Sequence, residues 1–141
     1  MENLSIPSCF YRVSIKALIL NAEKRFLLLQ ENTGIYSLPG GGLDRWEIPQ
    51  TGISREMQEE VGVSVQSVAK YPSYFFTFHD RKGYRSANLV YETVILEEEL
   101  QHFQPSDECV EYGFFTKEEA EKMQIYPNVQ EFLNHFNPDN H

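Results

Sequence analysis

The chain has 141 residues, a common size for one domain, and its 41% hydrophobic and 23% charged residues are ordinary globular values that exclude general disorder. Lysine and arginine total 12 against 21 for aspartate and glutamate, which gives a net charge of −9. This balance argues against a protein that binds duplex nucleic acid or an anionic membrane surface through its overall charge.

The two cysteines, Cys9 and Cys109, stand a hundred positions apart and have no metal-ligand spacing. The start of the chain lacks the basic and apolar regions of a secretory signal, and its apolar runs are too short to cross a bilayer. We therefore expect reduced thiols, a cytoplasmic location, no membrane partner, and a single domain over residues 1–141.

The first half of the chain is predicted to form two strands and a helix. Apolar residues alternate at the start of residues 12–20, and residues 25–30 form a short apolar run, so both segments are predicted strands. Pro39–Gly42 is predicted to be irregular. A helix is expected over Pro49–Val61, with proline at its start, Gly62 after its end, and an apolar stripe of Ile53, Met57 and Val61.

The second half alternates strands with two short helices. Aromatic and β-branched residues predict strands at 63–69, 74–78, 89–96 and 112–115. Thr116 and Glu119 form a capping-box pattern that starts a helix to about Gln124, and a last helix is predicted over Asn128–Phe136, after which residues 137–141 should fray. This order favours an α/β fold in which helices sandwich a mixed sheet.

The predicted helix at 49–61 carries an unfavourable arrangement of acids. Glu56, Glu59 and Glu60 fall within an arc of roughly 100°. They lie in the last two turns, where the helix dipole prefers cations, and the arrangement costs about 1 kcal/mol. A divalent cation with carboxylate ligands would offset this cost. A solvated glutamate-rich helix is the alternative, because glutamate has good helix propensity.

The segment GGLDRWEIPQTGISREMQEEVGV, residues 41–63, favours the metal site over the solvated helix. It resembles the signature of the Nudix hydrolase family in its acids, its arginine and its closing glycine, and Leu38-Pro39-Gly40 resembles the usual lead-in. Two positions depart from that pattern. Trp46 stands where a small residue is common, and Gly52 stands where alanine is usual, at a cost of about 0.5–1 kcal/mol.

The resemblance implies a Nudix-type α/β/α sandwich with a mixed β-sheet, and a pyrophosphohydrolase that uses Mg²⁺ or Mn²⁺. It implies that Glu56, Glu59 and Glu60 ligate metal or orient the attacking water, and that the carbonyl of Gly40 or Gly41 completes the site. Arg55 and Glu47 would pair to support these ligands, an interpretation compatible with a structural salt bridge.

The resemblance also directs attention to residues outside the motif. A further acid often assists in the family, and Glu108 lies at the expected place, with Glu111 or a solvated loop as alternatives. Trp46 could stack on a base or simply pack, and Arg81 could steer phosphates or belong to a solvated turn. Asn128 could read a base, although with Glu131 it also matches a helix N-cap pattern.

The expected substrate is a nucleoside diphosphate linked to another moiety, with a nucleoside triphosphate or similar small nucleotide favoured. Nucleotide sugars and dinucleoside polyphosphates are the alternatives within the same chemistry. A non-catalytic nucleotide-binding module is the alternative outside it, and the net charge disfavours an RNA 5′ end. The sequence leaves a homodimer open.

Overall fold

The computed structural model describes residues 10–80 and 82–141, so Cys9 and the predicted phosphate-steering residue Arg81 lie outside the described residues. The main sheet has five strands: β1 (Arg12–Leu18), β4 (Gly40–Gly42), β5 (Ser67–Val68), β6 (Tyr74–His79) and β7 (Arg85–Val94). β1 pairs with β7 in parallel and with β4 antiparallel, whereas β5 and β6 pair antiparallel with different parts of β7. The sheet is therefore mixed, as predicted.

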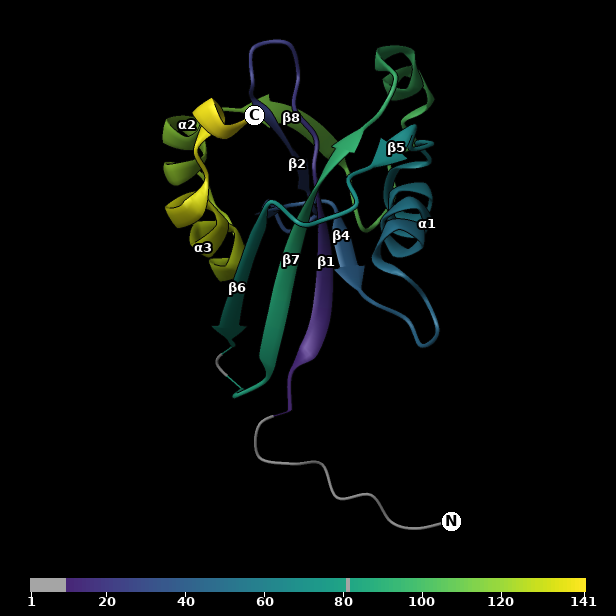
Figure 1. Ribbon diagram of the computed structural model, residues 1–141. Coiled ribbons are helices and arrows are strands. Elements are labelled where there is room, and N and C mark those ends of the chain that lie inside the picture. Colours follow the sequence, from purple (N-terminus) through teal and green to yellow (C-terminus); the bar gives the residue numbers. More distant parts are fainter. Residues whose placement is uncertain (1–9, 81) are drawn as a thin grey trace.

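A smaller antiparallel sheet completes the β structure. It has three strands in the order β3 (Tyr36–Ser37), β2 (Phe26–Gln30) and β8 (Glu111–Phe115). The helices are α1 (Pro49–Val61), α2 (Lys117–Glu121) and α3 (Pro127–His135), with short 3-10 helices η1 (Glu97–His102) and η2 (Pro138–Asn140). α1 lies on one side of the curled strands and α2 and α3 lie on the other (Figure 1), which confirms the expected α/β/α sandwich. Among the described residues, no helix combines the length and apolar character that a bilayer crossing requires.

Strand β1 divides the hydrophobic core into two clusters. Ile15 and Ala17 pack in the cluster that contains Ile53 and Met57 of α1. Leu18, on the opposite face of β1, belongs to the cluster that contains the α3 ring of Phe132. Because side chains alternate along a strand, the polar residues of β1 share the α3 side of the sheet.

Helix α1 forms where the sequence predicts it. Pro49 occupies its first turn, and Gly62 takes a left-handed φ of 69° after its end, donating its N–H to the Gln58 carbonyl. The structure also explains Gly52, since a Cβ there would lie 2.3 Å from Ile15 Cδ1. Close packing of α1 on β1 therefore requires glycine at a position where helix propensity alone disfavours it.

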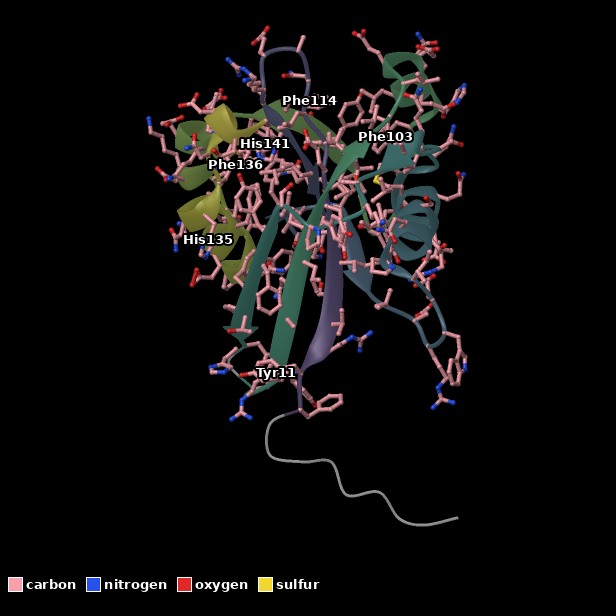
Figure 2. The ribbon with its side chains drawn as sticks, viewed as in Figure 1. Tyr11, Phe103, Phe114, His135, Phe136 and His141 are labelled. Carbon is pink, nitrogen blue, oxygen red and sulfur yellow. The ribbon has the colours of Figure 1, made fainter. Side chains whose placement is uncertain are left out.

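Two segments predicted to be irregular or frayed are ordered. Gly40–Gly42 forms strand β4, which pairs with β1, although glycine is disfavoured in strands. At the C-terminus, the His141 side chain is only 3% exposed, and its Nε2 lies 2.8 Å from the Tyr74 hydroxyl. Its ring also stacks on Phe136 with centroids 5.8 Å apart (Figure 2). Both predictions were therefore wrong, because tertiary pairing overrode local propensity.

Candidate active site

The glycines of β4 leave space for two glutamates of α1. A Cβ on Gly41 would lie 2.7 Å from Glu56 Oε1, so the Glu56 carboxylate occupies the space that a side chain would need. Glu60 reaches the same strand, and its Oε1 accepts a 2.8 Å hydrogen bond from the Gly40 N–H. The structure thus brings four of the predicted metal-site residues together at one edge of the sheet.

Arg55 connects the other predicted residues to this edge. Its guanidinium donates to both carboxylate oxygens of Glu47, at 2.8 and 3.0 Å, and this pairing raises the pKa of Arg55 and lowers that of Glu47. It also donates to Glu56 at 3.0 Å and to Glu59 at 3.2 Å. One arginine therefore fixes the loop before α1 and two acids of the helix.

Glu60 lies in a crowded anionic environment. Burial raises the pKa of Glu60 to about 8; the Gly40 N–H and the Lys16 charge act against this shift, and the Glu56 and Glu108 charges add to it. Glu108 is exposed, yet it is close enough to act on Glu60 electrostatically. The alternative acid, Glu111, is the first residue of β8.

The loop that carries Glu108 is anchored to the end of α1. The Ser106 hydroxyl donates to the Glu60 carbonyl at 3.4 Å and accepts from the Glu108 N–H at 3.2 Å. This anchoring holds the loop beside the acid-bearing helix.

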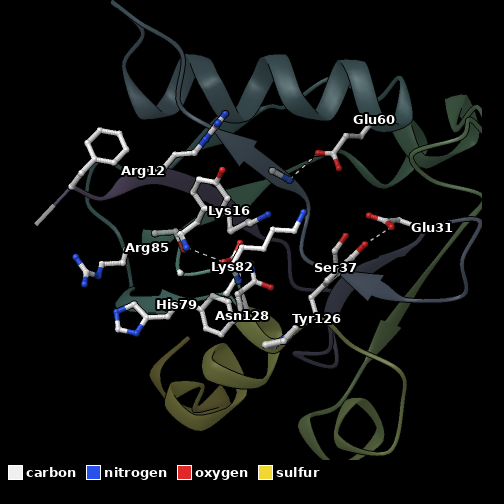
Figure 3. Close-up of a pocket in the computed structure, with 18 residues that line it drawn as sticks. Arg12, Lys16, Glu31, Ser37, Glu60, His79, Lys82, Arg85, Tyr126 and Asn128 are labelled. Atoms are coloured by element: carbon white, nitrogen blue, oxygen red, sulfur yellow. Dashed lines mark hydrogen bonds between the residues drawn. The ribbon is translucent and has the colours of Figure 1, made fainter. Parts of the chain in front are cut away.

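A large cleft opens beside these acids on the α3 side of the sheet. Its volume is about 1550 Å³, more than the usual size of a small-molecule site. Gly40 and Glu60 line one part of it, and cations from β1 and the β6–β7 hairpin are among the residues that line the remainder (Figure 3). These cations are Arg12, Lys16, Lys82 and Arg85. A protein with a net charge of −9 therefore presents a concave surface that carries both acids and cations.

Lys16 is a cleft residue that the sequence analysis missed. Burial lowers its pKa, while the charges of Glu60, Glu56 and Glu31 oppose that shift. The signal was present in the alternation of β1, because Lys16 falls on the face opposite the apolar residues Ile15 and Ala17. Alternation alone does not distinguish a cleft from open solvent.

A second missed feature is the contact between Tyr126 and Glu31. The Tyr126 hydroxyl donates to Glu31 Oε2, and this hydrogen bond is the main reason that the pKa of Tyr126 is raised to about 12. Both residues line the cleft. They lie 95 positions apart in the chain, so no local pattern could have paired them.

The predicted substrate residues have different positions. Asn128 lines the cleft from the first turn of α3, and the helix begins at Pro127 after an N-cap at Tyr126. The N-cap interpretation of Asn128 was therefore wrong. Trp46 is 95% exposed, has a positive φ of 66°, and is not among the residues that line the cleft. A left-handed backbone favours glycine, so the conformation at position 46 explains why the family signature commonly has a small residue there.

Comparison with known proteins identifies the family. The model of the NUDIX domain matches residues 10–136. The chain belongs to the Nudix family. A MutT-like protein of Streptomyces ambofaciens is 35% identical over 57 residues, which are 40% of this chain and 37% of that relative. The chain thus matches well under two thirds of that relative's length.

Solved Nudix-type structures share the fold. The MutT protein of Methanosarcina mazei Go1 superposes with a TM-score of 0.73 at 24% identity, covering 92% of this chain and 95% of that one. An ADP-ribose pyrophosphatase of Streptococcus suis gives a TM-score of 0.54 at 24% identity, covering 77% and 76%. At these identities the resemblance supports the fold and leaves the substrate to the site itself.

The Nudix helix offers the oxygen donors that a hard divalent cation prefers. Within residues 10–80 and 82–141, no group of three or more acidic, histidine or cysteine side chains already converges as a metal site. Instead, Arg55 holds Glu56 and Glu59, and the Gly40 N–H holds Glu60. The glycine space that holds Glu56 and the crowded charge around Glu60 nevertheless fit a site that a cation would complete.

Proposed function

We propose that this Nudix protein is a divalent-metal-dependent pyrophosphohydrolase that cleaves the phosphoanhydride linkage of a small nucleotide. The observation that carries the proposal is the position of Glu56 and Glu60. Both carboxylates meet the glycine strand β4, and Glu60 also lines the large cleft. Carboxyl groups gathered at one wall of a cleft that also holds cations suit an anionic substrate that binds together with a metal ion.

The metal would be held by Glu56, Glu59 and Glu60, with carbonyl oxygens of Gly40 or Gly41 as further donors. A bound Mg²⁺ or Mn²⁺ would supply charge neutralisation of the phosphate oxygens and activation of the attacking water. Arg55, itself fixed by Glu47, orients the carboxylates of Glu56 and Glu59. Glu108, exposed beside Glu60, accepts the proton of the water that attacks phosphorus.

Within this chemistry we propose a nucleoside triphosphate or similar small nucleotide as substrate, bound with its base near Asn128. The position of Asn128 in the cleft supports this assignment. Nucleotide sugars and dinucleoside polyphosphates remain the second candidate class. They are favoured by the size of the cleft. We also propose that residues 1–141 work as one domain in the cytoplasm.

The test is a panel of nucleoside triphosphates, nucleotide sugars and dinucleoside polyphosphates, assayed with Mg²⁺ or Mn²⁺ and with both products identified. We expect metal-dependent release of a nucleoside monophosphate or diphosphate from at least one class. Metal-dependent nucleotide binding without turnover of any compound would instead establish a non-catalytic nucleotide-binding module.

A further inference from the structure

Strand β1 presents two cations to the cleft, Arg12 and Lys16. Ile15 and Ala17 are fully buried under α1, so Arg12, Ser14 and Lys16 lie on the opposite face of the sheet. Lys16 stands opposite Gly40 in the β1–β4 register. Its side chain therefore enters the cleft beside the strand that Glu60 contacts, as Figure 3 shows.

Lys16 is partly buried in the wall of the cleft, and its ammonium group makes no direct polar contact with the other described residues. Glu60, Glu56 and Glu31 all act on it electrostatically. No hydrogen bond or ion pair joins its Nζ to any side chain or carbonyl in residues 10–80 and 82–141. The nearby acids are engaged elsewhere, since Glu60 accepts from the Gly40 N–H and Glu31 accepts from Tyr126.

The three N–H donors of the Lys16 ammonium group therefore face the cleft unused by any described residue. A lysine kept only as a counter-ion would be expected to form a hydrogen-bonded pair with one of the carboxylates. An anionic ligand in the cleft would satisfy the donors and the charge together, because phosphate oxygens are strong acceptors for an ammonium group.

We propose that Lys16 binds the phosphate chain of the substrate, on the cleft side of β4 and next to the carboxylates of α1. This assignment rests on the proposed function and adds a substrate-binding residue to it. Lys16 donates to phosphate oxygens that the acidic residues would repel. The cleft thereby combines a cation of the protein with the metal-dependent acids, and it selects substrates with adjacent phosphates.

The experiment compares Lys16→Met and Lys16→Arg with the unchanged protein and with Lys70→Met. Methionine keeps much of the apolar stem, and arginine restores a cation. Lys70 lies outside the cleft, over the Tyr71 ring at 5.5 Å, so its replacement controls for the loss of one lysine charge. KM, kcat and melting temperature are measured for the preferred substrate of the panel. Binding of α,β-methylene-ADP is measured with and without Mg²⁺.

We expect Lys16→Met to raise KM by roughly tenfold or more and to weaken binding of the analogue similarly, with little change in melting temperature. Lys16→Arg should recover most of that loss, and Lys70→Met should behave like the unchanged protein. If Lys16→Met has a clearly lower melting temperature, binding of the analogue is compared between Lys16→Arg and Lys16→Gln instead. Tighter binding by Lys16→Arg would support the assignment, and equal binding would overturn it.

Unchanged KM and unchanged analogue binding in Lys16→Met would overturn the assignment. So would tighter Mn²⁺ binding with unaltered KM, because Lys16 would then only neutralise the acids. These outcomes differ from failure of the proposed function, in which the unchanged protein itself would turn over no nucleotide.

Discussion

At the residue scale, the glycines of β4 matter because they have no side chain and so leave space for neighbouring groups. Glu56 Oε1 lies 2.7 Å from where a Gly41 Cβ would be, and Arg12 Nη2 lies 2.3 Å from the corresponding point at Gly42. One glycine thus makes room for an acid of α1 and the next for a cation of β1. The two successive glycines thus allow charged groups to lie on opposite faces of the same strand.

This arrangement predicts the effect of Gly41→Ala. Gly41 has no positive φ, so alanine fits the backbone, but its Cβ would displace the Glu56 carboxylate. We expect turnover to fall by roughly tenfold to a hundredfold, because a displacement of about 1 Å at a catalytic group has effects of that size. Steady-state kinetics and thermal melting measure the two consequences, and the melting temperature should stay near that of the unchanged protein.

The double variant Gly41→Ala with Glu56→Gln shows whether the effect acts through Glu56. If it does, alanine at position 41 should reduce turnover little further once the carboxylate is gone. Fully multiplicative losses would contradict the proposed role of this glycine.

Glu60 gives a second prediction at this scale. Glu60→Gln keeps the shape of the side chain and an oxygen that can accept from the Gly40 N–H, but it cannot ionise and so cannot offer a carboxylate to a cation. We expect an intact fold and turnover lowered by roughly a hundredfold or more at saturating Mg²⁺. Glu118→Gln, on the exposed start of α2, is the matched control. Unchanged turnover in Glu60→Gln would remove this residue from the site.

At the element scale, local signals predicted α1 and the start of α2 closely. Pro49, Gly62 and the buried stripe fixed both ends of α1 and its packed face. The Thr116–Glu119 capping box formed as the pattern indicates, with both hydrogen bonds present. These signals act within a few residues, so they can be read from the chain alone.

Elements that depend on distant partners were harder to predict. β4 is a strand only because β1 lies beside it. α3 begins at Pro127, directly after Tyr126, whose backbone N–H donates to the Tyr36 carbonyl. The residues of the site also fall into a group that local sequence signals locate and a group that they do not. The motif located Glu47, Arg55 and the acids of α1, whereas Lys16, Glu31 and Tyr126 reach the cleft from three separate segments. Recognising those residues required knowledge of which strand faces lie together.

The start of α2 carries a prediction about pH. Hydrogen bonds from Thr116, together with Arg25 at 2.9 Å, hold the pKa of Glu119 below its ordinary value of 4.5. A group whose pKa is lowered by folding stabilises the native state above its unfolded pKa and loses that effect as the pH falls. We expect Glu119→Gln to lower the free energy of unfolding at neutral pH, and the difference to narrow as the pH falls below 4.5.

Urea denaturation of both proteins across this pH range measures the difference. Glu118→Gln, a neighbour outside the capping hydrogen bonds, controls for the loss of one charge on α2. A constant difference between the proteins at every pH would show that the Glu119 charge is not the cause.

At the scale of the whole molecule, charge is distributed unevenly. Acids exceed cations by nine, yet four cations of the described residues, Arg12, Lys16, Lys82 and Arg85, line one cleft. The cleft cations act at short range on a ligand that enters it. The net charge acts on the part of a ligand that extends beyond the cleft. Its effect is screened over a length of about 8 Å at physiological salt.

This distribution predicts discrimination by substrate length. A 5′-triphosphorylated RNA of about ten nucleotides should inhibit hydrolysis of the preferred small nucleotide at least about tenfold less strongly than an unreactive mononucleotide analogue does. The RNA can place one phosphate cluster in the cleft, but its remaining phosphates meet a protein whose net charge is −9. Inhibition constants measured at low and at physiological salt test the cause, because screening should narrow the difference between the two inhibitors. Tighter inhibition by RNA than by the mononucleotide would show instead that the cleft cations continue into a track for a longer polyanion, and that the net charge does not govern what this surface binds.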